Sequence, residues 1–271
     1  MANKDFKEIE KLLKLAASYE GKPSFAMKLA SGNYDERLLY SFDIENYETK
    51  QFQELTSWLR GYLDKNVDPV EIHRNRKIPK TVLDELAQHL LGAKVKKDYG
   101  GLGLSTLQYC HLMRILAGTS SSLGIWFTAN CSIGLSGYLM VVYDQLKKEQ
   151  KEAKSTDEKL EIEKLIARTE WQMKEFLPKL AAGANAGFGL TQETAGSDPM
   201  AMIGTDTIAE KTNDGKFHVR GHKLYNTGGT IAEFEVIMAP LLPDNSISTF
   251  IVPTSGYGVF QAVPCDFEGN R

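Results

Sequence analysis

Two segments in the last third of the sequence carry most of the residues that could hold a ligand. Residues 187–202, GFGLTQETAGSDPMAM, open as a strand and close in small and hydroxyl residues. Residues 221–232, GHKLYNTGGTIA, have the same character. Strand ends of this kind expose backbone N–H groups and hydroxyls, which suit a ring edge with carbonyls or a pyrophosphate. Tyr225 could place an aromatic face beside a planar ligand, although ordinary β-turns have the same composition.

Other catalytic groups form no recognisable pattern. Neither HExxH nor GxSxG occurs, so a metal site or a hydrolase triad has no support. The histidines are scattered: His73, His89, His111, His218 and His222. Glu193 and Asp198 are close in sequence, but one carboxylate pair in a loop is weak evidence for acid–base catalysis. Residues 99–105, YGGLGLS, lack the GK[ST] and GxGxxG patterns and indicate a tight connection between helices rather than a phosphate loop.

Hydrophobic periodicity predicts helices first and strands afterwards. Helical spacing indicates helices over 4–20, 48–65, 79–91 and about 105–117, with a loop-rich arm at 21–47. After Gly183 the period changes, and short strands are expected at 216–220, 233–238 and 248–252, with turns at 213–215 and 243–245. This order predicts an α+β chain or two separate domains.

Two long stretches inside the helical part differ in composition from the helices before them. Residues 115–143 contain no charged residue, and this stretch is long enough to span a membrane. Ser, Thr, Asn and Gly interrupt it throughout, however. A buried helix pair is therefore favoured over a membrane helix. Residues 144–174 are dense in Lys and Glu and predict a solvated helix, or two with a break near 154–157.

Composition is that of an ordinary globular protein. Of 271 residues, 42% are hydrophobic and 25% charged, and the net charge of −3 gives no reason to expect nucleic acid. Cys110, Cys131 and Cys265 are far apart, which favours neither disulfides nor zinc and suits a reducing setting. The first residues do not resemble a signal peptide. We therefore expect a cytoplasmic protein.

Four segments, in this order, resemble signatures of the acyl-CoA dehydrogenase family of flavoproteins. Residues 99–105 are similar to its YGG-x-G turn, and residues 176–183, FLPKLAAG, to its YLP-x-L-x-x-G segment. Residues 189–198, GLTQETAGSD, resemble its LTEP-x-AGSD signature, and residues 221–232 its G-x-K-x-WITNG-x-x-A segment. The resemblance covers roughly residues 78–265. Each motif is loose alone, but four in register are specific.

The resemblance implies an N-terminal helical domain, a central β-barrel and a C-terminal four-helix bundle. Acyl-CoA and FAD meet between them. In the family, a bundle glutamate removes the α-proton of the thioester, the β-hydride passes to flavin N5, and an electron-transfer flavoprotein reoxidises the FAD. Family members are commonly homodimers or homotetramers.

Residue roles follow from the same resemblance. Thr191 matches the threonine that bonds the pyrimidine edge of the flavin, and Phe188 and Leu190 match positions that contribute backbone groups there. Ser197 matches a serine close to the FAD pyrophosphate and the acyl-CoA.

The second segment is expected to hold the rest of the flavin. Tyr225 stands where the family usually has Trp against the isoalloxazine, and Thr227 matches the threonine that approaches N5. Asn226, between them, is expected to belong to the cofactor-binding set.

The sequence also departs from the family. Gln192 and Glu193 replace Glu-Pro, Tyr225 replaces Trp, the charged stretch 144–174 is unusually long, and the chain stops at Arg271. The bundle and its base would lie beyond that point, so no residue is assigned as the catalytic base.

These observations predict three regions: an N-terminal helix and arm (1–47), a helical domain with a charged insertion at 144–174 (48–183), and an incomplete middle β-barrel domain (184–271). Three interpretations stay open: a fragment of a longer enzyme, one half of a two-chain enzyme, or a non-catalytic relative. In the last case the charged stretch would dock a partner, or the module would bind acyl-CoA.

Overall fold

The computed structural model describes residues 28, 29, 32, 48–196, 198–256, 258 and 260–264. The chain divides into two compact units, Met1–Tyr47 and Glu48–Arg271, and all elements named below belong to the second. The helix expected over residues 4–20 lies outside the described residues.

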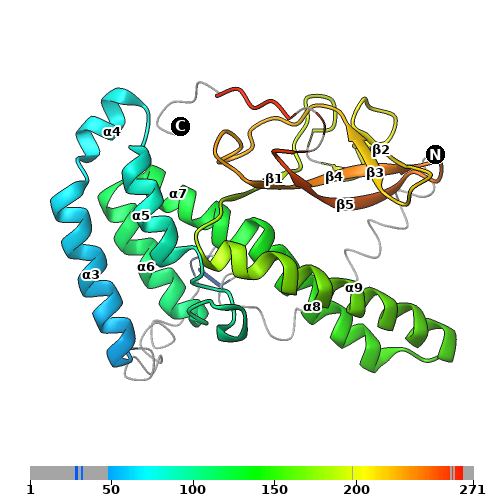
Figure 1. Cartoon of the computed structure of the whole chain (residues 1–271), viewed down its shortest axis with the longest axis horizontal. Coiled ribbons are helices and arrows are strands. Elements are labelled where there is room, and N and C mark those ends of the chain that lie inside the picture. Colours follow the sequence, from blue (N-terminus) through cyan, green and yellow to red (C-terminus); the bar gives the residue numbers. More distant parts are fainter. Residues whose placement is uncertain are drawn as a thin grey trace. The chain divides into compact units, whose positions relative to one another are not determined.

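The α-helices precede the strands along the second unit (Figure 1). The helical elements are α3 (Lys50–Asn66), α4 (Pro69–Asn75), α5 (Lys80–Leu90), η3 (Lys97–Tyr99), α6 (Thr106–Thr119), α7 (Ser121–Thr128), η4 (Ala129–Ile133), α8 (Leu135–Glu152), α9 (Thr156–Ala181) and η5 (Pro199–Met202). The helices expected over 48–65, 79–91 and about 105–117 are confirmed as α3, α5 and α6.

Local capping chemistry sets where several helices begin. Ser105 accepts a hydrogen bond from the Gln108 N–H, and the Gln108 side chain accepts one from the Ser105 N–H. This capping box starts α6. Asp68 accepts from the Val70 and Glu71 N–H groups and so starts α4. Helix α4 was not predicted, because its 7 residues are too few to show a period.

The glycine turn before α6 is a tight connection, as expected. The Gly103 N–H donates to the Val95 carbonyl at 2.8 Å, and the Leu102 N–H to the Gly92 carbonyl at 2.9 Å. A Cβ at Gly101 would lie 2.1 Å from the Val95 oxygen, so only glycine fits there.

The apolar stretch folds into α7, a π-helical segment (η4) and the start of α8. By length and composition the helical stretch Ser121–Glu152 could cross a membrane, but half of its apolar window is buried inside the protein. Leu123, Phe127, Leu135 and Leu139 are fully buried. This burial supports the expected buried helix pair, since core helices have the same composition.

The charged stretch forms two helices, and the break expected near 154–157 is confirmed. Helix α8 ends at Glu152, and Ser155 caps α9 by accepting from the Glu158 N–H. Leu146, Ile162 and Ile166, with Ala153, form a small buried cluster between the helices. The two helices run side by side in Figure 1, so the charged segment is a hairpin with its own core.

The described strands form one open, mixed sheet. They are β1 (Ala186–Gly189), β2 (Ile208–Lys211), β3 (Phe217–Arg220), β4 (Phe234–Leu242) and β5 (Ser246–Pro253). Strand β4 is central: it pairs in parallel with β1 and β2 and antiparallel with β5, while β3 pairs antiparallel with β2. The strands expected at 216–220, 233–238 and 248–252 are confirmed as β3, β4 and β5, and with them the α+β fold class.

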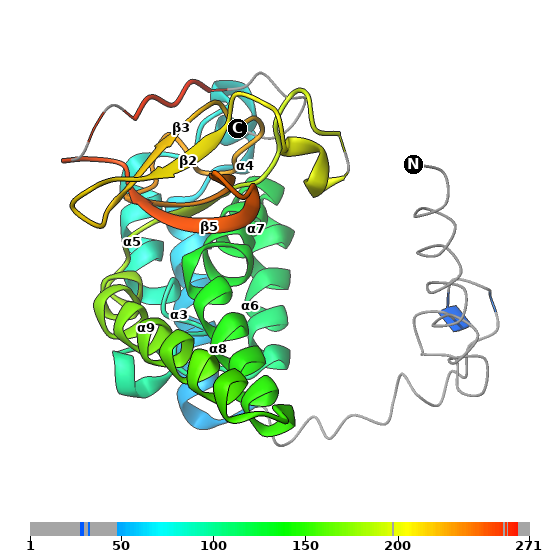
Figure 2. The same cartoon turned by 90° about the vertical axis from the view of Figure 1, so that its right-hand side faces the viewer.

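The sheet packs on α8 and α9. Figure 2 shows it lying across these helices. The shared buried core consists of Val95, Leu135, Leu139, Met173, Leu177, Leu180, Ala186 and Val236. Strand β1 therefore lies against the helical core, and its C-terminal end leads directly into the first of the two candidate ligand segments.

Candidate functional site

The structure brings the two candidate ligand segments together. The Leu224 N–H donates to the Thr191 carbonyl at 2.8 Å. The Lys223 Nζ donates to the Leu190 carbonyl at 3.1 Å, and the Phe188 N–H donates to Asn226 Oδ1 at 3.2 Å. The end of β1 and the loop at 221–232 thus form one continuous surface.

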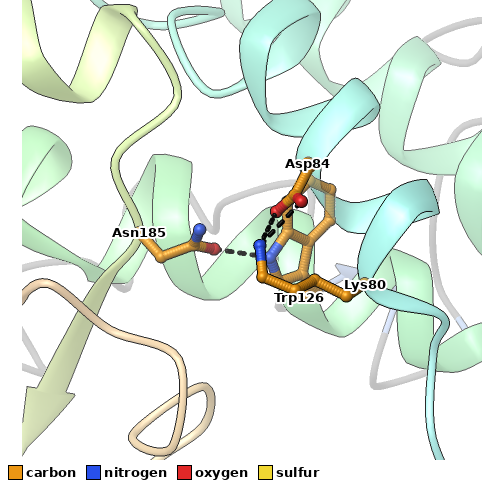
Figure 3. Close-up of polar contacts among 4 residues, drawn as sticks. All are labelled: Lys80, Asp84, Trp126 and Asn185. Carbon is orange, nitrogen blue, oxygen red and sulfur yellow. Dashed lines mark hydrogen bonds and ion pairs between the residues drawn. The ribbon is translucent and has the colours of Figure 1, made fainter.

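Buried polar contacts hold the start of β1 on the helical core. Trp126 Nε1 of α7 donates to Asn185 Oδ1 at 2.8 Å (Figure 3). Asn130 Oδ1 accepts from the Ala186 N–H at 2.8 Å, and Asn130 Nδ2 donates to the Trp126 carbonyl. Asn130 lies in the π-helical segment, which places its amide beside the strand. Figure 3 also shows an exposed ion pair on α5 between Lys80 and Asp84, which contributes little to stability.

Three of the predicted site residues present exposed side chains beside this junction. Thr191 and Thr227 are exposed, and the Tyr225 side chain is 59% exposed. The Tyr225 backbone is left-handed, with φ +57°, which is uncommon for a bulky residue. Outlying dihedrals of this kind cluster at ligand sites, where the surrounding structure holds them in place. Two threonines and one tyrosine are therefore accessible to solvent where the two segments meet.

Asn226 has a different orientation from its neighbours. Its Oδ1 accepts from the Phe188 N–H, and its Nδ2 donates to Glu235 Oε2 at 2.6 Å. Glu235, the second residue of β4, is 0% exposed. Burial raises the pKa of Glu235 to about 7, against the opposing effect of the hydrogen bond from Asn226. The amide of Asn226 thus binds inside the protein.

Lys223 begins a directed chain of hydrogen bonds beneath the first segment. Its Nζ donates to Gln192 Oε1 at 2.9 Å, Gln192 Nε2 donates to Thr205 Oγ1 at 2.6 Å, and Thr205 Oγ1 donates to the Met202 carbonyl at 2.7 Å. Burial lowers the pKa of Lys223 to about 8, although the charge of Asp206 opposes this. Gln192, one departure from the family pattern, therefore orients the loop through its amide.

Ser197 lies outside the described residues. Its neighbour Gly196 has φ +57°, and Asp198 accepts from the Met200 N–H at 2.9 Å. Glu193 is exposed in the preceding turn. Asp198 thus caps the short η5 helix, a structural role for one of the two loop carboxylates.

Several functional candidates were missed by sequence reasoning. They are Lys223, Glu235, Trp126, Asn130 and Asn185. Glu235 had a readable signal, because it is an acid inside the apolar strand FEVIMAP. The other contacts join residues far apart in the sequence, and the hydrophobic periodicity of a single segment does not predict such contacts.

Within the described part of the chain, no group of three His, Cys, Asp or Glu residues could hold a metal ion. Cys110 and Cys131 are free thiols, and burial raises the pKa of the Cys131 thiol far above its usual range. Burial also lowers the pKa of His111, with help from the charges of Arg114 and Arg60. In the sequence, these thiols and His111 are far from the two candidate ligand segments. The candidate site itself consists of amides, hydroxyls, one lysine and one buried acid.

Comparison with known proteins relates the sequence of the chain to one family. Residues 49–153 match the model of the acyl-CoA dehydrogenase N-terminal domain. The probable acyl-CoA dehydrogenase FadE10 of Mycobacterium tuberculosis is 32% identical over 260 residues, which cover 92% of this chain and 35% of that protein. This chain therefore spans about a third of the length of that relative.

Solved structures share the fold. Butyryl-CoA dehydrogenase from Megasphaera elsdenii matches with a TM-score of 0.57 and 24% identity, over 76% of this chain and 49% of that one. Glutaryl-CoA dehydrogenase from Mycobacterium smegmatis, solved in complex with FADH2, matches with a TM-score of 0.55 and 23% identity, over 79% of this chain and 48% of that one. The sequence matches identify the chain as a member of the acyl-CoA dehydrogenase family.

Proposed function

We propose that these residues are the helical and middle β regions of an FAD-dependent acyl-CoA dehydrogenase that forms 2-enoyl-CoA, as in fatty-acid β-oxidation. One observation carries the proposal. Three hydrogen bonds join the segment at the end of β1 to the loop at 221–232. Thr191, Tyr225 and Thr227 are exposed where these two segments meet. An edge of hydroxyls and backbone groups beside an exposed ring fits a planar ligand with several acceptors.

The flavin-binding set in this proposal is Phe188, Leu190, Thr191, Ser197, Tyr225, Asn226 and Thr227. FAD would supply the acceptor for the substrate hydride. The residues fit this group, because the Lys223 side chain holds the Leu190 carbonyl inward. In a planar trans peptide the Thr191 N–H then points the opposite way, toward the exposed side. A fixed donor there costs no reorganisation when charge develops on a ligand.

The remaining assignments belong to the whole enzyme. Ser197 would lie close to both the FAD and the acyl-CoA substrate, an electron-transfer flavoprotein would be the acceptor, and the enzyme would be a cytoplasmic homodimer or homotetramer. The family resemblance puts the proton-abstracting glutamate in a bundle that these residues do not include. We therefore expect no turnover by these 271 residues alone, whether the rest comes from the same or a second polypeptide.

Flavin retention tests the proposal. The purified chain is mixed with excess FAD and desalted, and the absorbance spectrum is recorded. A retained, perturbed flavin spectrum supports a working half-site. If no flavin is retained, this chain alone is not the functional unit, and the same measurement moves to the full-length parent.

The double variant Thr191→Val/Thr227→Val should weaken FAD binding by a few kcal/mol at most, since each change removes one or two hydrogen bonds. Thr230→Val is the matched control, because Thr230 is an exposed threonine of the same loop that the flavin-binding set does not include. Equal affinities for the wild type and the double variant would count against the assignment.

The alternative, a non-catalytic interaction or acyl-CoA-binding module, stays a prediction. Its docking surface would be the charged stretch 144–174 of the α8–α9 hairpin, on which Trp171 is 62% exposed. Deleting residues 147–170 is a poor test, because it removes Ala153, Ile162 and Ile166 from the buried cluster of the hairpin. A substitution at Trp171 leaves that cluster intact.

A further inference from the structure

A hydrogen-bonded pair, the half-buried amide of Asn226 and the buried carboxyl of Glu235, adjoins the proposed flavin site. Asn226 Nδ2 donates to Glu235 Oε2 at 2.6 Å, and Asn226 Oδ1 accepts from the Phe188 N–H at 3.2 Å. One amide therefore joins three chain segments: the end of β1, the loop at 221–232 and the start of β4. Bonds between a carboxyl group and an amide in a buried setting are worth more than the same bonds in water.

The fold makes room for this carboxyl group. In the parallel register of β1 and β4, Gly187 lies opposite Glu235. A Cβ at Gly187 would lie 2.4 Å from Glu235 Oε1 and 2.5 Å from Oε2. The acid thus fills the space that any other residue at 187 would need. Its Oε1 is buried, and no partner for it lies within the described residues.

The buried carboxyl group of Glu235 lowers the stability of the protein, and this cost suggests that the group has a function. Burying a carboxyl oxygen without a partner destabilises a protein, and a valine or leucine would suit the interior of a strand such as β4 better. The neighbours of Asn226 in the chain show what the acid supports. Tyr225 holds a left-handed backbone, and both Tyr225 and Thr227 are exposed.

We propose that Asn226 and Glu235 are positioning residues that set the flavin-facing geometry of the Phe188–Thr191 and Tyr225–Thr227 segments. This inference rests on the proposed function. Asn226, expected from the sequence to belong to the cofactor set, then acts with its side chain turned away from the ligand. Glu235 fixes which way the amide points, because its carboxyl can accept from the Nδ2 group and leaves Oδ1 for the Phe188 N–H.

Hydrogen exchange of the ligand-free protein gives the first readout. Asn226→Ala and Glu235→Leu should each speed exchange at the amides of Phe188 and Leu224 by about tenfold, the effect of losing roughly one buried hydrogen bond. Amides of α6 should not change. Glu235→Gln retains an acceptor oxygen for Asn226 and should keep exchange within about twofold of the wild type.

Flavin binding gives the second readout, on the same variants in the chain or its full-length parent. Asn226→Ala and Glu235→Leu should weaken FAD binding about tenfold and shift the bound flavin spectrum. Glu235→Gln should restore both affinity and spectrum, which a loss of general packing would not allow. Thr230→Ala, in the same loop, is the control.

The outcomes separate the two claims. Unchanged exchange at Phe188 and Leu224 in Asn226→Ala overturns the positioning role, whatever the flavin result. Accelerated exchange together with a full-length wild type that binds no FAD supports the positioning of the two segments and overturns the proposed function instead. If Glu235→Leu fails to fold, Asn226→Ala and Glu235→Gln decide the question.

Discussion

At the scale of single residues, the site is explained by pairs rather than by individual side chains. Gly187 is a glycine because Glu235 lies against it, and Glu235 is tolerated in a buried strand because Asn226 donates to it. Lys223 is held in the same way by Leu190 and Gln192. In each pair, one residue is understandable only when its neighbour in space is known.

Gly187→Ala should destabilise the protein by about 2 kcal/mol, the usual cost of forcing extra volume into a packed site. Combining it with Glu235→Ala should recover part of this loss, because the new methyl group then enters the space of the missing carboxyl. Chemical denaturation of the four proteins of the cycle measures the coupling. Gly61→Ala is the control: its Cβ meets nothing within 4 Å in α3, so it should be neutral or stabilising. Simple additivity would contradict the contact.

At the scale of elements, the π-helical segment between α7 and α8 joins the helices to the sheet. It presents the Asn130 amide to the backbone N–H of Ala186 at the first residue of β1. Trp126, one turn earlier, binds Asn185 just before the strand. The position of β1, and with it the end that carries the candidate site, therefore depends on one irregular turn of helix.

Asn130→Leu should lower the free energy of unfolding by about 2–3 kcal/mol, since the buried Ala186 N–H loses its acceptor. Urea denaturation followed by circular dichroism measures this. Asn75→Leu, at an exposed position of α4, should change stability by less than about 0.5 kcal/mol. Equal effects of the two substitutions would mean that the Asn130 contact does not hold the strand.

At the scale of the whole molecule, the buried acid links folding to pH. Folding raises the pKa of Glu235 from 4.5 to about 7, so the folded state holds this proton more tightly than the unfolded chain. The contribution of Glu235 to stability is therefore most favourable below pH 4.5 and is lost as the pH rises through 7. The separation between these two values corresponds to about 3 kcal/mol.

Glu235→Gln should remove this pH dependence. The difference in unfolding free energy between the variant and the wild type should move in favour of the variant as the pH rises from about 5 to 7.5, and then level off. Denaturation curves at four or five pH values measure it. The exposed Glu193→Gln is the control. A constant difference between the Glu235 variant and the wild type would show that Glu235 does not titrate in this range.

The sequence by itself determined the features that depend on neighbours along the chain. The break near 154–157, the turns at 213–215 and 243–245, and the helices and strands with a clear period were all predicted, because each signal lies within a few residues. The family signatures belong here too, since a ligand loop is a short run of residues.

Only the tertiary structure decided which residues far apart in the sequence contact one another. Phe188 and Asn226 are 38 residues apart, and Trp126 and Asn185 are 59 apart. The parallel pairing of β1 with β4, which sets Gly187 opposite Glu235, joins distant segments and is encoded by no local pattern. Strand β2, with 4 residues, was missed for the same reason: its pairing with β3 and β4, rather than its own sequence, makes it a strand.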